Sequence, residues 1–307
     1  MTTPLPALPT ESSAWDQALY AFLVEKGDRS GSKRTVESYS RMPWHFFKVT
    51  TPDRVTPAVV LAYAHGIGLS GKPPSPVTIG ARIACLSSYF RFLIRMGLVK
   101  SNPCDLVERP RVSPSAARGY SADEVRRILD VVPDSIQGRR DRAILLVFIL
   151  TGRRRSEVMD LKAGDITIED DTVCYSYRGK GGKRGRRELP RPAWEAIRRT
   201  LSDCGRELAT MDPEESLWQA GAGSTALSGS TFYARFRRYL VAAGLQPTGL
   251  HILRHSAAKL RRDAGESVET VSAILDHSSL AVTATYLRRL EGVEDHYWER
   301  VAEAIGV

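Results

Sequence analysis

The sequence has few features of a secreted, membrane-embedded or metal-dependent protein. Its 307 residues include only four cysteines, with no CxxC pair and no metal-ligand spacing, so we expect free thiols in a reducing cytoplasm. No apolar run approaches the length that we expect of a membrane span. The first nine residues contain three prolines but no basic start or apolar stretch, which favours a loose arm over a secretion signal.

Repeats, low-complexity tracts and a glycine-rich nucleotide loop are also missing. The closest group of carboxylates is Asp165, Glu169, Asp170 and Asp171. These residues bracket a predicted turn between strands, so a solvated turn is a better interpretation than a metal site. We therefore expect neither a metal nor a nucleotide cofactor.

Positive charge is abundant in both halves of the chain. The net charge is +9, and residues 1–110 contribute 13 Lys+Arg against 8 Asp+Glu, or +5, which leaves +4 for the rest. This distribution suits a protein that holds DNA between two basic domains. On charge alone, a basic soluble protein without a nucleic-acid partner is an equal alternative.

The first third of the chain is predicted to be helical. The expected segments are 14–25, 32–48, one opening with Thr56 as cap and Pro57 at the first helical position, and one following the loop 72–76. Pro43 should kink or end the second segment. In the last, one stripe is apolar: Ile79, Ile83, Leu86, Phe90 and Leu93. Arg82, Arg91 and Arg95 lie on its opposite face and are candidate DNA contacts, and Gly97 is the predicted C-cap.

The polar, proline-rich stretch 109–118 is the predicted linker between two domains. The expected parts are an arm (1–12), a helical domain (13–108), the linker and a second domain (119–307). In the second domain, Ser121 and Glu124 form a capping box, 141–150 is a helix, and residues 166–190 alternate with the period of a strand. Helical patterns return from Ser230. The predicted fold is mainly α with one small antiparallel sheet.

Three short segments carry groups suited to attack on a phosphodiester. The segment 251–256 places His251 and Arg254 at i,i+3, on one helix face, and His277 and Tyr286 follow nine residues apart. The segment Thr151–Val158 follows an apolar helix and contains three consecutive arginines. The third, 179–190, is a glycine-rich basic run between two extended stretches.

With these residues the chain resembles the tyrosine recombinase (phage integrase) family, most closely its Xer-like site-specific recombinases. The family pattern is Thr-Gly-x-Arg-x-x-Glu, a Lys in a Gly-Lys-Gly hairpin, His-x-x-Arg, a His or Trp, and a Tyr nucleophile. The matching residues, in order, are Arg154, Lys180, His251, Arg254, His277 and Tyr286. The resemblance covers nearly the whole chain. It implies a helical core-binding (SAM-like) domain before a catalytic domain, a tetramer on paired DNA sites and a cytoplasmic, nucleoid-associated enzyme.

Arg154 and Arg254 are the expected clamp on the phosphate, because guanidinium groups bind nonbridging oxygens bidentately and stay charged. Counting from Thr-Gly selects Arg154 from its neighbours Arg153 and Arg155. The family usually has an apolar residue where this chain has Arg153. Glu157 is expected to hold the backbone or an arginine in place.

Tyr286 is the predicted nucleophile, and Tyr297 is its chief competitor. A phenol with a pKa near 10 needs a base and nearby positive charge to attack at neutral pH. We expect His251 to take its proton and His277 to donate a hydrogen bond to a nonbridging oxygen. The product would be a 3′-phosphotyrosine, which conserves the phosphodiester bond energy, so no cofactor is required.

Six of the ten residues from Arg178 to Arg187 are basic. The resemblance implies that Lys180 is the general acid that protonates the 5′-hydroxyl leaving group, and Lys183 is the alternative. The simpler interpretation is a solvated basic loop that only neutralises phosphates. Arg178, Lys183 and Arg184 are candidate DNA contacts. A type IB-like topoisomerase and a DNA-binding regulator with a vestigial site are the rival functions. A predicted tail helix, 294–305, would dock on a neighbouring protomer or on its own domain.

Overall fold

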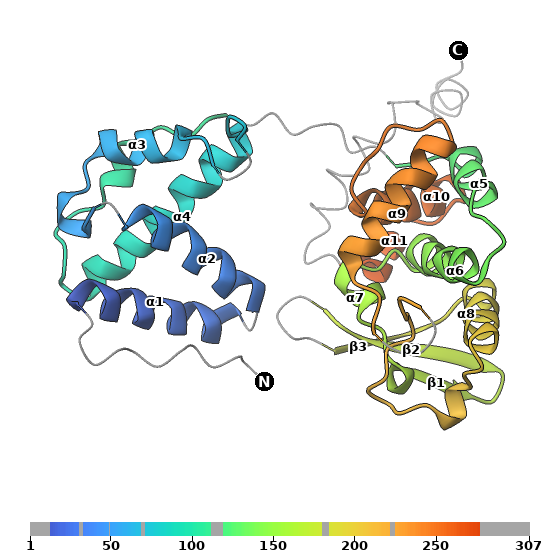
Figure 1. Ribbon diagram of the computed structural model, residues 1–307. Coiled ribbons are helices and arrows are strands. Elements are labelled where there is room, and N and C mark those ends of the chain that lie inside the picture. The colour runs from blue at the N-terminus through green and yellow to red at the C-terminus, as the bar shows by residue number, and fades with distance from the viewer. Residues whose placement is uncertain are drawn as a thin grey trace, which may run out of the picture. The chain divides into compact units, whose positions relative to one another are not determined.

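Two compact units make up the chain, and each is described by itself (Figure 1). The computed structural model describes residues 13–30, 33–48, 50–68, 71–111, 119–179, 184–221 and 225–276. The division between the units falls within the predicted linker, 109–118.

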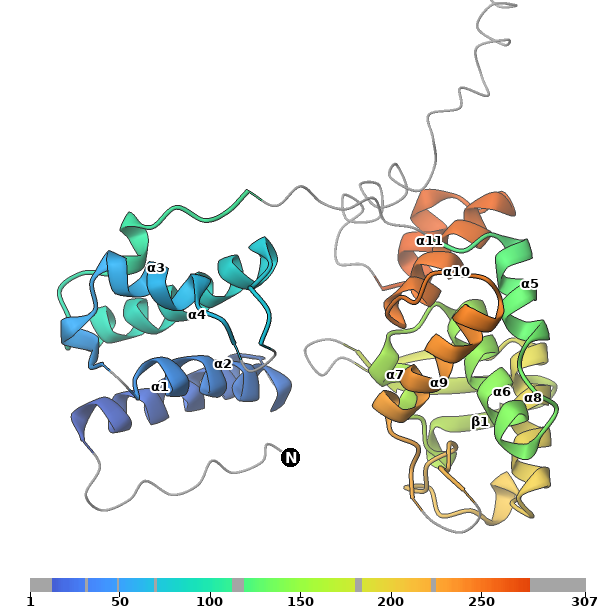
Figure 2. The same ribbon diagram turned by 45° about the horizontal axis from the view of Figure 1, so that its top comes forward.

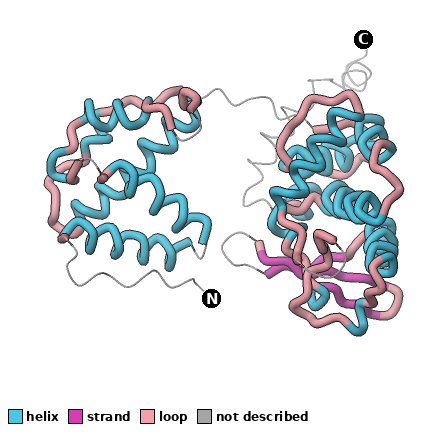
Figure 3. Tube along the Cα trace, viewed as in Figure 1, coloured by secondary structure: helices cyan, strands magenta, loops and turns pink. Residues whose placement is uncertain are grey.

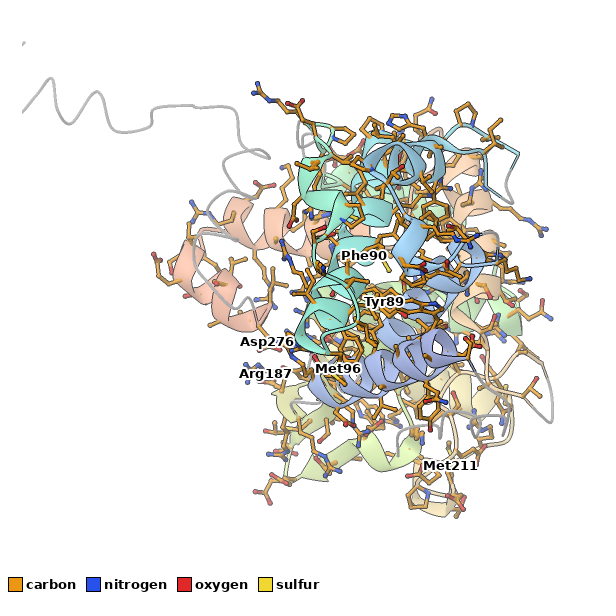
Figure 4. The ribbon with its side chains drawn as sticks, turned by 90° about the vertical axis from the view of Figure 1, so that its left-hand side faces the viewer. Tyr89, Phe90, Met96, Arg187, Met211 and Asp276 are labelled. Atoms are coloured by element: carbon orange, nitrogen blue, oxygen red, sulfur yellow. The ribbon has the colours of Figure 1, made fainter. Side chains whose placement is uncertain are left out.

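The first unit is built from helices, and its described residues include no strand (Figure 3). Its elements are α1 (Ala14–Ser30), α2 (Lys33–Phe46), η1 (Pro52–Arg54), α3 (Pro57–His65), α4 (Pro76–Arg95) and η2 (Pro103–Leu106). Aromatic rings fill its core. Tyr89 and Phe90 of α4 are buried there (Figure 4), and the Phe22 ring of α1 lies 5.1 Å from that of Tyr89, as in a tilted aromatic pair.

Several local predictions for this unit are confirmed, and one of the two outcomes predicted at Pro43, an end of the helix, is excluded. Thr56 caps α3 by accepting a hydrogen bond from the Val59 amide at 3.4 Å. Pro43 does not end its helix: α2 continues to Phe46, and the Phe47 amide bonds to the Pro43 carbonyl at 2.8 Å. Proline removes one backbone donor, whereas continuing the helix buries Phe46 in the aromatic core.

Helix α4 is the central helix of the first unit. All five residues of its predicted stripe are buried, and Gly97, with φ 71°, follows its end. By length and composition alone α4 could cross a membrane, contrary to the expectation from the sequence, and half of its most apolar window is buried within the unit. A core helix meets the same test because it too is apolar over most of its surface.

The second unit combines helices with one small sheet at one end (Figure 3). Its elements are α5 (Ala122–Asp130), α6 (Ile136–Thr151), α7 (Arg155–Met159), η3 (Ala163–Asp165), β1 (Ile166–Glu169), β2 (Thr172–Arg178), β3 (Arg184–Glu188), α8 (Arg191–Asp203), η5 (Leu208–Thr210), α9 (Gly229–Ala242), α10 (His251–Asp263) and α11 (Val268–Ile274). The predicted capping box at Ser121 is confirmed. The sheet is antiparallel in the order β1-β2-β3, as the period-two pattern predicted.

Helix α6 is the central helix of this unit and packs against α8 and α10. It begins at Ile136, five residues before the predicted start, because Ser135 caps it by accepting from the Gly138 amide at 3.1 Å. The polar first turn gave no apolar periodicity to reveal this start. Helices α10 and α11 lie side by side (Figure 2), so that the end of α11 comes close to the end of α6.

Candidate active site

The end of α6 lies shortly before Arg154, the first predicted catalytic arginine, which is the N-cap of α7. Gly152 ends this helix in the left-handed conformation, with φ 63°. A Cβ at Gly152 would collide with the Leu275 side chain and would lie 3.2 Å from Ala257 Cβ of α10. Glycine is therefore required twice here, for its φ and for the close approach of α10 and the end of α11.

Glu157 holds Arg154 in place, as expected from the sequence. Its Oε2 accepts from the Arg154 backbone amide at 2.9 Å, and its Oε1 accepts from Arg154 Nη1 at 2.7 Å. The Glu157 side chain is buried, whereas that of Arg154 is 31% exposed. One carboxylate thus fixes both the start of α7 and the guanidinium, and part of the guanidinium remains accessible to a ligand.

Arg254 comes from α10 and is almost completely buried, at 4% exposure. Its Nη1 donates to the Gly152 carbonyl at 2.9 Å, and its Nη2 donates to the Leu275 carbonyl at 2.5 Å. Burial and then the positive charges of Arg154 and Arg153 lower its pKa to about 10. Arg254 therefore stays protonated at neutral pH, within a site where positive charge is concentrated.

His251 is the first residue of α10, one turn before Arg254. His251 remains exposed at its surface, but partial desolvation by the surrounding protein, followed by the charges of Arg254 and Arg154, lowers its pKa below the ordinary value of 6.5. Its position in the first helical turn also disfavours the imidazolium, because the helix macrodipole is positive there. The neutral ring can accept a proton, as a general base must.

Arg154, His251 and Arg254 therefore come together from two different parts of the chain. Each of the two arginines contributes to the lowered pKa of His251, and Arg154 contributes to that of Arg254, so the three groups lie within electrostatic range. Two guanidinium groups beside a neutral imidazole can bind a phosphate and take a proton from a nucleophile.

Arg153 belongs to this region as well, although the sequence pattern left it aside. It is 1% exposed and stacks over the Tyr177 ring of β2, with its Cζ 4.4 Å from the ring centroid. Its guanidinium forms an ion pair with Asp276 and donates to the Ile274 carbonyl. Burial lowers its pKa, but the charges of Tyr175 and Asp276 and the bond to Asp276 more than offset this effect. The third arginine, Arg155, is exposed and lies against Gly229.

Asp276 collects donors from three elements. It binds Arg153, the Tyr177 hydroxyl of β2 and Arg187 of β3, whose Nη2 lies 3.0 Å from Asp276 Oδ1 (Figure 4). Burial raises its pKa, but the hydrogen bonds from Tyr177 and Arg153 outweigh that effect and hold the pKa below 3.8. Asp276 also has φ 51°, in the left-handed region that few residues other than glycine adopt. The sequence signals for this cluster were the additional arginine and the acidic residue before His277.

The remaining predicted groups lie outside the described residues. They are Lys180, Lys183, His277, Tyr286, Tyr297 and the tail 294–305. The structure shows the strands that flank the basic run, with Arg178 of β2 opposite Arg184 of β3. Within the described part of the chain, no group of three or more His, Cys, Asp or Glu side chains could hold a metal.

The predicted DNA contacts differ in what else their side chains do. Arg82 Nη1 donates to the carbonyls of Tyr63, Ala64 and Gly66 at the end of α3. Arg95 pairs with Glu25 at 2.5 Å and Arg91 with Asp105 at 3.8 Å. Arg178 and Arg184 are exposed, face each other across the hairpin and make no ion pair with a described residue. DNA contact by these five arginines, and by Lys183 outside the described residues, stays a prediction. Among the five, Arg178 and Arg184 have the most available charge.

Sequence comparison finds a family match and relatives that are tyrosine recombinases. The phage integrase family matches residues 120–292. The chain is 30% identical over 231 residues to tyrosine recombinase XerC of Syntrophus aciditrophicus (strain SB), which covers 71% of this chain and 73% of the relative. It is 27% identical to tyrosine recombinase XerC of Alcanivorax borkumensis, over 88% of each chain.

Solved structures share the fold. A lambda integrase tetramer bound to a Holliday junction matches with a TM-score of 0.66 and 20% identity, over 94% of this chain and 81% of the other. XerH site-specific recombinase bound to palindromic difH substrate matches with a TM-score of 0.64 and 16% identity, over 98% and 91%. At these identities the likeness extends to the fold.

Proposed function

This chain belongs to the phage integrase family of tyrosine recombinases, and from that premise we propose that it cuts and rejoins DNA at specific sites through a 3′-phosphotyrosine at Tyr286. The observation that carries the proposal is the convergence of Arg154, His251 and Arg254 at the junction of α6, α7 and α10. These are a phosphate clamp and a base. The nucleophile and the acid are assigned by their positions in the family motif.

In the cleavage step, the Tyr286 oxygen attacks phosphorus while His251 takes the phenolic proton. The P–O bond to the 5′ oxygen breaks, and Lys180 donates the proton that completes the 5′-hydroxyl. Arg154 and Arg254 stabilise the charge on the nonbridging oxygens, with a hydrogen bond from His277. Such preorganised charge is usually the largest catalytic contribution.

Rejoining reverses the same chemistry. The 5′-hydroxyl of another strand attacks the phosphotyrosine, and Tyr286 leaves as the phenol with the proton returned by His251. The number of phosphodiester bonds is conserved, so the reaction needs no external source of energy. We propose that four protomers, held on paired sites, exchange one strand of each duplex at a time, with the tail 294–305 docking on a neighbour.

The direct test is capture of the covalent intermediate. A duplex nicked near the cleavage site loses its short 5′-hydroxyl strand by diffusion, which traps the enzyme on DNA. We expect a denaturant-resistant adduct whose DNA-linked peptide contains Tyr286. Recombination of two paired sites, compared with relaxation of a single-site plasmid, separates a recombinase from a type IB-like topoisomerase. Absence of any adduct with a nicked duplex that contains the protein's own target site would refute the proposal.

Cleavage should depend on pH through His251. Because its folded-state pKa lies below 6.5, the ring is neutral at pH 7, and the rate of adduct formation should be flat above neutrality. The rate should fall at more acidic pH, as the pH passes through the lowered pKa of His251 and the ring becomes protonated. Replacing His251 by glutamine should lower the plateau by about 10²–10⁴-fold and remove this acid limb. His65→Gln, in the first unit, is the matched control, and an unchanged acid limb in His251→Gln would exclude His251 as the base.

DNA binding should weaken steeply with salt. Several phosphate contacts predict a loss of about 10³–10⁵ in affinity between roughly 50 and 200 mM salt, because bound counterions are released. Replacing both Arg178 and Arg184 by glutamine should make the slope of log affinity against log salt shallower by about two. Titration by fluorescence anisotropy measures this slope. If the affinity of the parent protein for DNA did not change with salt, its basic surfaces would not be the surfaces that bind DNA.

A further inference from the structure

We propose that Asp276 is a positioning residue for strand cleavage. It connects the β2–β3 hairpin and the buried Arg153 to the end of α11, immediately before the sequence segment that contains His277 and Tyr286. This inference rests on the proposed function, since it concerns the geometry of the same reaction.

The first support is the convergence of contacts on a single carboxylate. Arg153 approaches it from the end of α6, Tyr177 from β2 and Arg187 from β3. The Cα register places Tyr177 opposite Gly185 and Arg187 opposite Tyr175, so the two sheet residues belong to neighbouring strands of one hairpin. Asp276 therefore joins the end of α6 and the β2–β3 hairpin, both of which lie far from it in the sequence.

The second support is that the end of α11 anchors the clamp itself. The last carbonyls of a helix lack partners within the helix and carry the negative end of its dipole. Here the Ile274 carbonyl accepts from Arg153, and the Leu275 carbonyl accepts from Arg254. The Ala273 carbonyl accepts from Arg187 at 3.4 Å. The carboxylate of Asp276 adds a full negative charge beside these three carbonyl groups. The three arginines and the end of α11 therefore hold one another in place.

The third support is the backbone conformation. Asp276 has φ 51° and follows Leu275, the C-cap of α11, so the backbone leaves the helical conformation at this residue. Left-handed conformation at a non-glycine residue costs free energy and persists where surrounding contacts determine it. Its side-chain bonds supply such contacts, and in the sequence Asp276 is followed directly by His277 and, nine residues after His277, by Tyr286.

The test compares two aspartates that share this backbone conformation. Asp170, in the turn between β1 and β2, also has φ 51° but is exposed. Asp276→Gly and Asp170→Gly both relieve the strain of a left-handed residue. Only Asp276→Gly removes a carboxylate that binds Arg153, Tyr177 and Arg187. We expect Asp276→Gly to slow adduct formation at saturating nicked duplex by about 10- to 100-fold, since small misplacements of reacting groups have effects of this size. DNA affinity should change little, and Asp170→Gly should match the parent protein.

A second pair of variants separates positioning from simple charge neutralisation. Asp276→Gly leaves Arg153 buried without its counterion, which should lower the melting temperature. In Arg153→Leu/Asp276→Gly the buried charge is gone, so we expect the melting temperature to recover while cleavage stays slow. Recovery of the cleavage rate together with the melting temperature would overturn the proposal.

Tyr177→Phe offers a milder variant that removes only the hydroxyl that binds Asp276. We expect cleavage to slow severalfold at saturating DNA without loss of affinity. Parent-like cleavage in both Tyr177→Phe and Asp276→Gly, with an adduct still formed by the parent protein, would reject the positioning role alone. A parent protein that forms no adduct would instead reject the proposed function.

Discussion

Replacing Tyr286 by phenylalanine should abolish covalent capture of DNA while leaving DNA binding intact. The substitution removes one oxygen atom and keeps the aromatic ring, so it deletes the nucleophile without otherwise altering the side chain. Loss of a nucleophile removes the covalent route entirely, and comparable substitutions in other enzymes lower rates by roughly 10⁶-fold. We therefore expect no adduct on nicked duplex, measured by denaturing gel, together with parent-like affinity in a gel-shift assay.

Tyr297→Phe is the matched control, because Tyr297 is the other tyrosine near the carboxyl end of the sequence that could act as nucleophile. It should form the adduct at the parent rate. If Tyr297→Phe lost the adduct and Tyr286→Phe retained it, the nucleophile would have to be reassigned.

Replacing Arg254 by lysine should lower cleavage by about 10²–10³-fold, the effect of losing one preorganised donor group in a desolvated site. Two of its five N–H donors are used by the Gly152 and Leu275 carbonyls, at 2.9 and 2.5 Å. In the proposed reaction, that anchorage leaves the remaining donors for the phosphate. Lysine keeps the charge but cannot form a planar fork that spans two carbonyls and a phosphate. The rate of adduct formation at saturating DNA measures the loss.

Arg261→Lys is the matched control in the same helix. Arg261 also donates to a carbonyl, that of Leu150 at 3.0 Å, and pairs with Glu266 at 2.6 Å. Both variants should lose some stability, which thermal melting will measure, but only Arg254→Lys should lose cleavage. Equal cleavage by the two variants would mean that Arg254 stabilises the fold and that other groups bind the phosphate.

Local features of the fold could be predicted from sequence because their causes are local. Ser121 and Glu124 cap a helix three residues apart, and Gly97 follows a helix end where only a small residue adopts positive φ without strain. Period-two alternation predicted the sheet. Local patterns did not reveal the start of α6, where a capping serine lies outside the apolar pattern, and they did not show that α2 continues past Pro43.

The sequence predicted the candidate groups of the site but not the contacts that connect them. The sequence order of the motif identified Arg154, His251 and Arg254, which the structure brings within electrostatic range of one another. It gave no partner for Arg153, although that side chain is the most deeply buried of the arginines near the site. It also gave no role to Asp276, which is 123 residues further along the chain.

The sequence by itself determined which chemical groups the protein has, the order in which they occur, and the helices and strands that carry them. Those properties depend on residue identity and on neighbours within a few positions. Only the tertiary structure decided that Arg82 caps α3 and that the end of α11 receives the arginines. The physical reason is that arginine has a long, flexible stem, and its partner is whichever carbonyl or carboxylate the folded backbone brings near its guanidinium.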